Sequence, residues 1–272
     1  MPSLRTVNER PLLDRARRLA DRVKRRSISV VPTRSLESWE KRHERKVKES
    51  VERIVPHLSD EGTFLDIGCN IGSFTRNLRA VRPRARGFLF EPVQEYADIA
   101  RARFADDDRL TVHRIGMGNE TGPKTIYKPA HNYGGNSIVE EIMFDRRPNT
   151  AVPPGTVMTE ETIELHDACD WLLANDPGPI DVIKSDTEGY DWAVLESLHR
   201  WAVEPGQRPT IFVEVFTAKW HPFADRQQAA IDAFVELGYG DVDIESTISG
   251  ICGDVLLIHP DHPSRAAGGR GA

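Results

Sequence analysis

Short apolar runs alternate with stretches of helical spacing along residues 63–259. The apolar runs predict strands, which are Thr63–Ile67, Arg86–Phe90, Leu110–Arg114, Ile180–Lys184, Thr210–Val215 and Asp254–His259. The stretches between them place apolar residues three and four apart and predict helices over Phe74–Val81, Val93–Phe104, Trp192–His199 and Arg226–Leu237. This alternation is typical of βαβ units around a parallel sheet. We therefore predict an α/β fold.

The N-terminal part of the chain has another pattern and another charge. Residues 9–26 and 35–56 each predict a helix, with Pro32 between them and Ser35 as a candidate cap. Residues 1–50 carry 15 Lys or Arg against 7 Asp or Glu, although the whole chain has a net charge of −6. We expect a basic helical extension over residues 1–58, an acidic domain over 59–262 and a flexible tail over 263–272.

Composition narrows the class of protein further. Nothing in the 272 residues approaches an apolar run of bilayer length, and the N-terminus lacks the apolar stretch of a secretory signal, so we expect a cytoplasmic protein. The three cysteines contain no CxxC pair and are expected to be free thiols. Residues 129–155, rich in Pro, Gly and polar side chains, predict a long loop, in which residues 131–137 are a candidate lid over a ligand or a merely solvated loop.

One segment has the pattern of a nucleoside-binding loop. In FLDIGCNIGSF, residues 64–74, a strand is followed by a glycine-containing turn and the start of a helix. Gly68 and Gly72 allow backbone to approach a ligand, and a helix N-terminus offers unpaired N–H groups to a carboxylate. Glu91 ends the next strand, where its carboxylate can accept both ribose hydroxyls. Asn70 interrupts the G-x-G-x-x-G pattern of nicotinamide enzymes, so the turn that binds pyrophosphate is missing.

Acidic residues follow two of the later strands. Asp186 and Glu188 come directly after Ile180–Lys184, at the edge where open parallel sheets bind ligands, and they are candidate catalytic residues that orient or deprotonate a hydroxyl. A helix cap is the alternative for both. Glu214 stands in an apolar strand and needs a partner, either an Arg or hydrogen-bond donor or a hard cation shared with Asp186. We therefore hypothesise Mg²⁺ on Asp186 and Glu214.

His221 is a third candidate catalytic residue. It follows the strand of Glu214 and precedes Pro222, in a loop where an imidazole could act as a base near neutral pH. A loop histidine without a catalytic role is the alternative.

Several motifs together resemble the FkbM-type methyltransferases. They are FLDIGCNIGSFT, Phe90-Glu91-Pro92, the turn from Gly118 to Gly122, Gly135-Asn136-Ser137 and, above all, IDVIKSDTEGYDWAVLESL. The resemblance runs from about residue 62 to residue 259 and implies a Rossmann-like class I fold, with a seven-stranded, mostly parallel sheet and flanking helices. It also implies S-adenosylmethionine as cofactor and methylation of oxygens on sugars and natural products. Family members usually read IDVEGYE where this chain has SDTEGYD, so Ser185, Thr187 and Asp191 are departures.

The residues expected to bind the cofactor come from three strand ends. They are Asp66, Gly68, Cys69, Asn70, Gly72, Glu91, Gly116, Met117 and Asp186. Gly116 and Met117 follow the third strand and would meet the adenine, although a simple polar turn is the alternative there. We expect the cofactor to lie across the carboxyl ends of the first strands.

Three functions remain open from the sequence. The leading one is an S-adenosylmethionine-dependent O-methyltransferase acting on a sugar, glycan or natural-product acceptor, without nucleic acid and with a homodimer as one assembly. The second is an RNA methyltransferase that holds phosphates with its basic extension. The third is a non-enzymatic protein that binds a partner and senses the cofactor.

Overall fold

A seven-stranded sheet forms the centre of the computed structural model, which describes residues 33–130, 132–144, 156–204, 207–216, 221–241 and 252–262. The strand order is β3-β2-β1-β7-β8-β10-β9, and only the pairings of β10 with β8 and β9 are antiparallel. The strands are β1 Thr63–Ile67, β2 Arg86–Phe90, β3 Leu110–His113, β7 Val182–Ser185, β8 Thr210–Phe216, β9 Gly240–Asp241 and β10 Cys252–Ile258. The expected α/β fold is confirmed; the expected helix over residues 9–26 and the tail over 263–272 lie outside the described residues.

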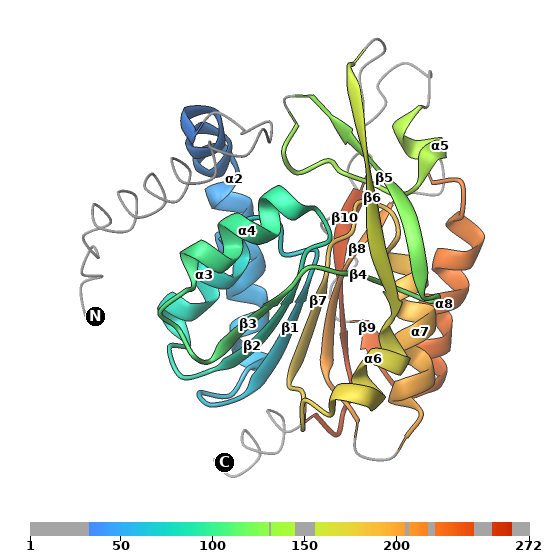
Figure 1. The fold of residues 1–272 in the computed structure, drawn as a ribbon. Helices are drawn as coiled ribbons and strands as arrows, with labels where there is room; N and C mark the ends of the chain where they lie inside the picture. The colour runs from blue at the N-terminus through green and yellow to red at the C-terminus, as the bar shows by residue number, and fades with distance from the viewer. Residues whose placement is uncertain are drawn as a thin grey trace.

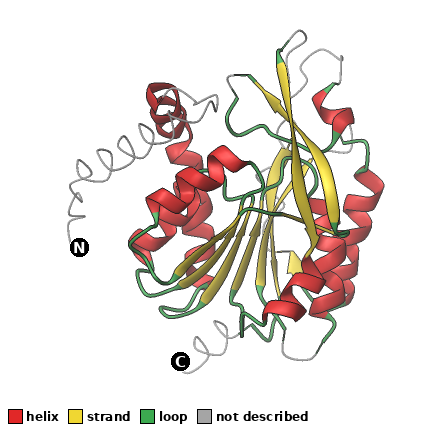
Figure 2. Ribbon diagram, viewed as in Figure 1, coloured by secondary structure: helices red, strands yellow, loops and turns green. Residues whose placement is uncertain are grey.

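Helices cover both faces of this sheet (Figures 1 and 2). The helices on one face are α2 Thr33–Ile54, α3 Ser73–Val81 and α4 Gln94–Arg103; those on the other are α6 Ala168–Asn175, α7 Asp191–Ala202 and α8 Ala224–Glu236. Side chains alternate between the faces along each strand, as the period of a strand requires. In β1, Leu65 and Ile67 pack in the core beside α7, whereas Phe64 packs in the core beside α3.

Helix α2 is part of the domain core. Val51 and Ile54 are buried with Phe64 and Phe212 of the central sheet, and a 3₁₀ turn over Val55–His57 leads into the domain. The expected boundary at residue 58 therefore does not separate this helix from the domain. Burial of its apolar stripe against the sheet, which its high charge masks in the sequence, accounts for the difference.

A second, three-stranded sheet was not expected. It has the order β4-β6-β5, with β4 Gly116–Gly118, β5 Gly122–Pro129 and β6 Met158–Asp167. Strands β5 and β6 extend beyond the central sheet (Figure 1). The region predicted as a loop over residues 129–155 contains a short helix, α5 Glu140–Met143, and residues 145–155 of it lie outside the described part.

Two expectations from composition concern the whole chain. In the part that the structure describes, no helix combines the length and the apolar character that a membrane span requires. Cys69, Cys169 and Cys252 are free thiols, as expected.

Candidate active site

A cavity of about 360 Å³ lies at the carboxyl ends of the central strands. Its floor comes from the ends of β1, β2, β7 and β8, and its walls come from α2, from β4 to β6 and from residues 132–138, which include most of the candidate lid. His131 of that lid lies outside the described residues. The volume suits a small ligand.

The glycine turn after β1 is shaped by a close approach of two strands. Gly68 has φ of +73°, and a Cβ there would lie 2.0 Å from the carbonyl oxygen of Asp186. A side chain at position 68 would therefore push the ends of β1 and β7 apart. Gly72 also has a positive φ, and a Cβ there would meet the ring of Phe104, so a glycine at this position allows α3 to pack closely. Gly72 does not line the cavity.

Glu91 is held rigidly at the edge of the cavity. Its two carboxylate oxygens accept the backbone N–H groups of Asn70, at 2.9 Å, and Val93, at 2.8 Å. Burial raises the pKa of Glu91 to about 7, although these two hydrogen bonds oppose the shift. Because a carboxylate oxygen can accept more than one hydrogen bond, Glu91 can still accept ribose hydroxyls, and its role in cofactor binding stays a prediction.

Asp66 is buried next to the residues that form the floor of the cavity. Its side chain is fully buried, accepts a hydrogen bond from the Thr75 hydroxyl at 2.6 Å and pairs with Lys184 Nζ at 3.1 Å. Asp66 does not line the cavity, so the predicted direct contact with the cofactor is not supported by this geometry.

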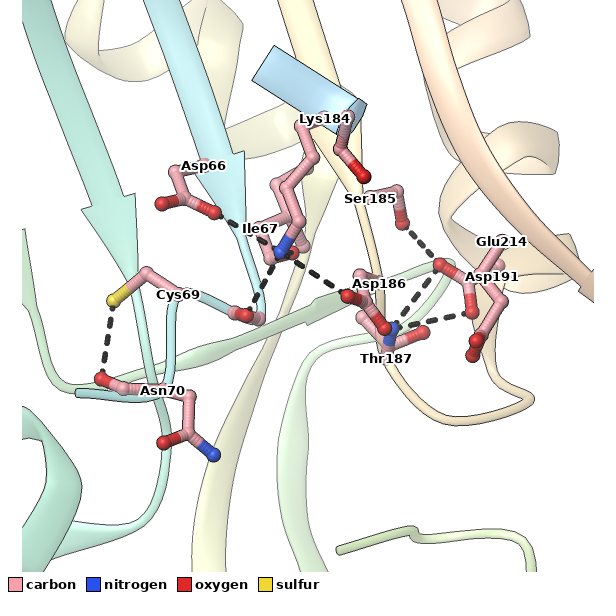
Figure 3. Close-up of polar contacts among 12 residues, drawn as sticks. Asp66, Ile67, Cys69, Asn70, Lys184, Ser185, Asp186, Thr187, Asp191 and Glu214 are labelled. Atoms are coloured by element: carbon pink, nitrogen blue, oxygen red, sulfur yellow. Dashed lines mark hydrogen bonds and ion pairs between the residues drawn. The ribbon is translucent and has the colours of Figure 1, made fainter. Parts of the chain in front are cut away.

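Lys184 links the two central strands and was missed in the sequence. Its buried ammonium donates to the carbonyl oxygen of Gly68 at 3.0 Å and lies 3.6 Å from Asp186 Oδ2, besides its pair with Asp66 (Figure 3). A charged residue inside the apolar run of β7 was the available signal, the same one that identified Glu214.

The cofactor end of the cavity fits a nucleoside with a carboxylate tail. Cys69, Gly116 and Met117 line it, as predicted, and so do Ser73 and Phe74 in the first turn of α3. No side chain caps this turn, so its N–H groups remain available to a carboxylate. Of the predicted cofactor residues, Asp66 and Gly72 do not line the cavity, and Asp186 lies with Glu188 and Glu214. The others line the cavity around the turn after β1, the end of β2 and β4.

Three carboxylates meet at the other end, which we call the acceptor end. One oxygen each of Asp186, Glu188 and Glu214 lies within 4.8 Å of the others. Burial and the charge of Asp186 raise the pKa values of Glu188 and Glu214. Lys46 of α2 lowers both, and its Nζ lies 3.8 Å from Glu214 Oε1. The structure thus brings the predicted catalytic and metal-binding acids together.

The three departures from the family pattern form one structural unit. The buried carboxylate of Asp191 accepts the Ser185 hydroxyl at 2.5 Å and the backbone N–H of Thr187 at 3.2 Å (Figure 3). These bonds fix the turn that carries Asp186 and Glu188 at the start of α7. Ser185, Thr187 and Asp191 therefore stabilise this acidic turn by hydrogen bonds to one another.

His221 lies beside this turn and not in the cavity. Its Nε2 donates to the carbonyl oxygen of Gly189 at 2.7 Å, and its Nδ1 accepts the N–H of Phe223 at 2.9 Å. The residue is buried, which lowers its pKa, and it does not line the cavity. Both ring nitrogens are engaged, so in this structure neither is available to take a proton from a ligand in the cavity, as the predicted base would have to do.

Helix α2 forms a wall of the cavity. Its Glu40 accepts two hydrogen bonds from Arg103, at 2.9 and 3.0 Å, and one from the Ser73 hydroxyl at 2.6 Å, which ties the helix to α3 and α4. The face turned to the cavity presents Trp39, His43, Lys46, Val47 and Ser50. The sequence indicated the helix but not this placement.

Two solved structures are similar to this chain at low sequence identity. The O-methyltransferase from Bacillus cereus in complex with SAH is 14% identical, with a TM-score of 0.49 and coverage of 92% of this chain and 90% of that chain. Aeropyrum pernix fibrillarin with natively bound S-adenosyl-L-methionine is 9% identical, with a TM-score of 0.43 and coverage of 75% of this chain and 68% of that chain.

The amino-acid sequence matches one relative and one family model. The 2-O-methyltransferase NoeI of Sinorhizobium fredii (strain NBRC 101917 / NGR234) is 25% identical over 135 residues, which are 48% of this chain and 55% of that relative. The match therefore spans about half the length of NoeI. The model of the methyltransferase FkbM domain matches residues 66–240, which is more than half of the chain.

Proposed function

This chain belongs to the FkbM methyltransferase family, and from that premise we propose that it transfers a methyl group from S-adenosylmethionine to a hydroxyl oxygen of a sugar, glycan or natural product. One observation carries the proposal. The same cavity joins an end suited to a nucleoside, around Gly68 and Glu91, to an end where Asp186, Glu188 and Glu214 can receive a proton. The name of NoeI, a 2-O-methyltransferase, agrees with oxygen as the acceptor atom.

The chain's residues have distinct tasks in this reaction. When bound, S-adenosylmethionine supplies an electrophilic methyl carbon on a sulfonium. Glu91 and the turn around Gly68 would hold the nucleoside, and an acceptor hydroxyl would bind at the other end of the same cavity. Asp186 would orient this hydroxyl, and Glu188 would take its proton as the hydroxyl oxygen accepts the methyl group. No covalent intermediate with the protein is required.

Mg²⁺ fits the acceptor end by its ligand chemistry. Asp186 and Glu214 offer hard oxygen ligands, and Glu214 Oε2 is buried without a hydrogen-bond partner among the described residues. An ion there would polarise the acceptor hydroxyl and lower its pKa.

The charge of the acceptor end also bears on the acceptor. Asp186, Glu188, Glu214 and Asp254 line it, with Lys46 as a counter-charge. Bringing a polyanion to these carboxylates would be unfavourable. We therefore propose a neutral or cationic acceptor, which disfavours RNA.

The test begins with S-adenosylhomocysteine binding to the folded chain by calorimetry. Labelled S-adenosylmethionine is then incubated with panels of sugars, glycosides and polyketide alcohols. We expect binding, transfer to at least one alcohol, and a loss of about 10²–10⁴-fold in kcat for Glu188→Gln with the binding of S-adenosylhomocysteine retained. Failure of the folded protein to bind S-adenosylhomocysteine would refute the proposal.

A further inference from the structure

The acceptor end of the cavity brings several acidic side chains close together. Glu214 is 3% exposed, its Oε2 has no hydrogen-bond partner among the described residues, and it lines the cavity. Asp254 is its cross-strand neighbour on β10, with a pKa that burial raises. A buried carboxylate oxygen without a partner is costly, so this position favours a cation.

The spacing of the carboxylates suits one ion. An oxygen of Asp186, one of Glu188 and one of Glu214 all lie within 4.8 Å of one another. Two oxygens on opposite sides of a hard divalent cation are about 4–5 Å apart, given metal–oxygen distances of about 2.0–2.6 Å. One oxygen of Glu188 therefore adds a third ligand to the two that the sequence suggested, and its other oxygen is the one left for the acceptor's proton.

A lysine already stands beside this position. Lys46 Nζ lies 3.8 Å from Glu214 Oε1, and its side chain is 57% exposed, so it can turn outward to solvent. The other lysine of the cavity, Lys184, pairs with Asp66 and donates to the carbonyl oxygen of Gly68, and at 3.6 Å from Asp186 Oδ2 it reaches only the Asp186 side of the cluster. Lys46 comes from α2, which precedes the region that the family model matches.

We infer that Asp186, Glu188 and Glu214 form a single cation site, which the Lys46 ammonium holds in the metal-free protein and from which a divalent metal displaces it. The site is the acceptor end of the proposed function, but the binding of the metal does not depend on that function. An ammonium and a hard divalent ion compete because both neutralise the same oxygens. Metal affinity is therefore set by a residue of α2 as well as by the carboxylates.

The experiment measures Mn²⁺ binding to the full chain by electron paramagnetic resonance and calorimetry, without cofactor or acceptor. We expect wild type to bind one ion, Lys46→Met to bind it about tenfold more tightly, and Glu214→Gln to lose it. Lys48→Met is the matched control, since it removes the same charge from the same helix but from a lysine that pairs with Glu44 at 2.8 Å. Its affinity should stay within about twofold of wild type. Asp186→Asn, at a half-exposed residue, tests the ligand set again if Glu214→Gln does not fold.

Each outcome decides the inference. No Mn²⁺ binding to wild type overturns it, and so does binding that appears only in Lys46→Met, since Lys46 would then be the permanent cation. Equal Mn²⁺ affinities of wild type and Lys46→Met would overturn the proposed displacement of Lys46 by the metal. S-adenosylhomocysteine binding without Mn²⁺ binding would refute the cation site and leave the proposed function standing; Mn²⁺ binding without S-adenosylhomocysteine binding would do the reverse.

Discussion

The two ends of the cavity satisfy their polar groups in opposite ways. At the cofactor end, Glu91 accepts two backbone N–H groups, and the buried Asp66 is matched by Thr75 and Lys184. At the acceptor end, Glu188 and Glu214 crowd Asp186, and one oxygen of Glu214 has no hydrogen-bond partner among the described residues. The comparison teaches that the first end is preorganised by the fold, whereas the second keeps binding capacity for a ligand.

We expect the largest effect on stability when the lysine at the centre of the preorganised cofactor end is replaced. Lys184→Met leaves Asp66 buried without its counter-charge and should lower the free energy of unfolding by about 3–5 kcal/mol. Urea denaturation measures the change. The double variant Asp66→Asn/Lys184→Met should recover part of the loss, and a loss below about 1 kcal/mol in the single variant would contradict the assigned pair.

The close approach at Gly68 should have the next largest effect. Gly68→Ala places a methyl group 2.0 Å from the Asp186 carbonyl oxygen at a positive φ, and we expect a loss of about 2–4 kcal/mol in stability with weaker binding of S-adenosylhomocysteine. Gly178→Ala is the control, because its φ of +79° is similar but nothing lies within 4 Å of the added methyl. Equal losses in the two variants would show that backbone strain alone, without the contact, decides the effect.

At the acceptor end we expect a substitution to increase stability, in contrast to the two losses expected at the cofactor end. Glu214→Gln replaces a buried carboxylate by a neutral amide of similar shape and should raise the free energy of unfolding by about 2 kcal/mol in the presence of EDTA. Thermal and urea unfolding measure this gain. Destabilisation by this variant would mean that the carboxylate is well satisfied, and the contrast between the two ends would fail.

The smallest expected effect concerns pH at the cofactor end. Glu91 has a pKa of about 7 in the free protein, and ribose hydroxyls donate hydrogen bonds to its ionised form, so bound nucleoside should lower this pKa. Below pH 7 binding must release a proton, and the affinity for S-adenosylhomocysteine should therefore rise about tenfold from pH 6 to pH 8. Calorimetry in two buffers of different ionisation enthalpy counts the proton. Glu91→Gln should bind more weakly with a flat profile, and a flat profile in wild type would exclude the role of Glu91.

Local pattern predicted the central elements well and the added sheet poorly. Strands β1 and β2 have the predicted bounds, because each is a short, mostly apolar and mostly buried run between turns. Strand β6, in contrast, has two glutamates and two threonines in its first half, where it is largely exposed. Its apolar pattern is too weak to predict a strand there, and pairing with β5 stabilises it. Helix α6 was missed because it is short and follows β6 without a loop.

The sequence by itself determined the strand, glycine turn and helix around Gly68 and the acid after the next strand, because these features depend on neighbours within one βαβ unit. Only the tertiary structure decided that Lys46 of α2 faces Glu214, 168 positions later, that Lys184 is committed to Asp66, and that His221 turns to Gly189. Contacts between distant segments follow from how helices and strands pack, and periodicity along the chain contains no information about which side chains then meet.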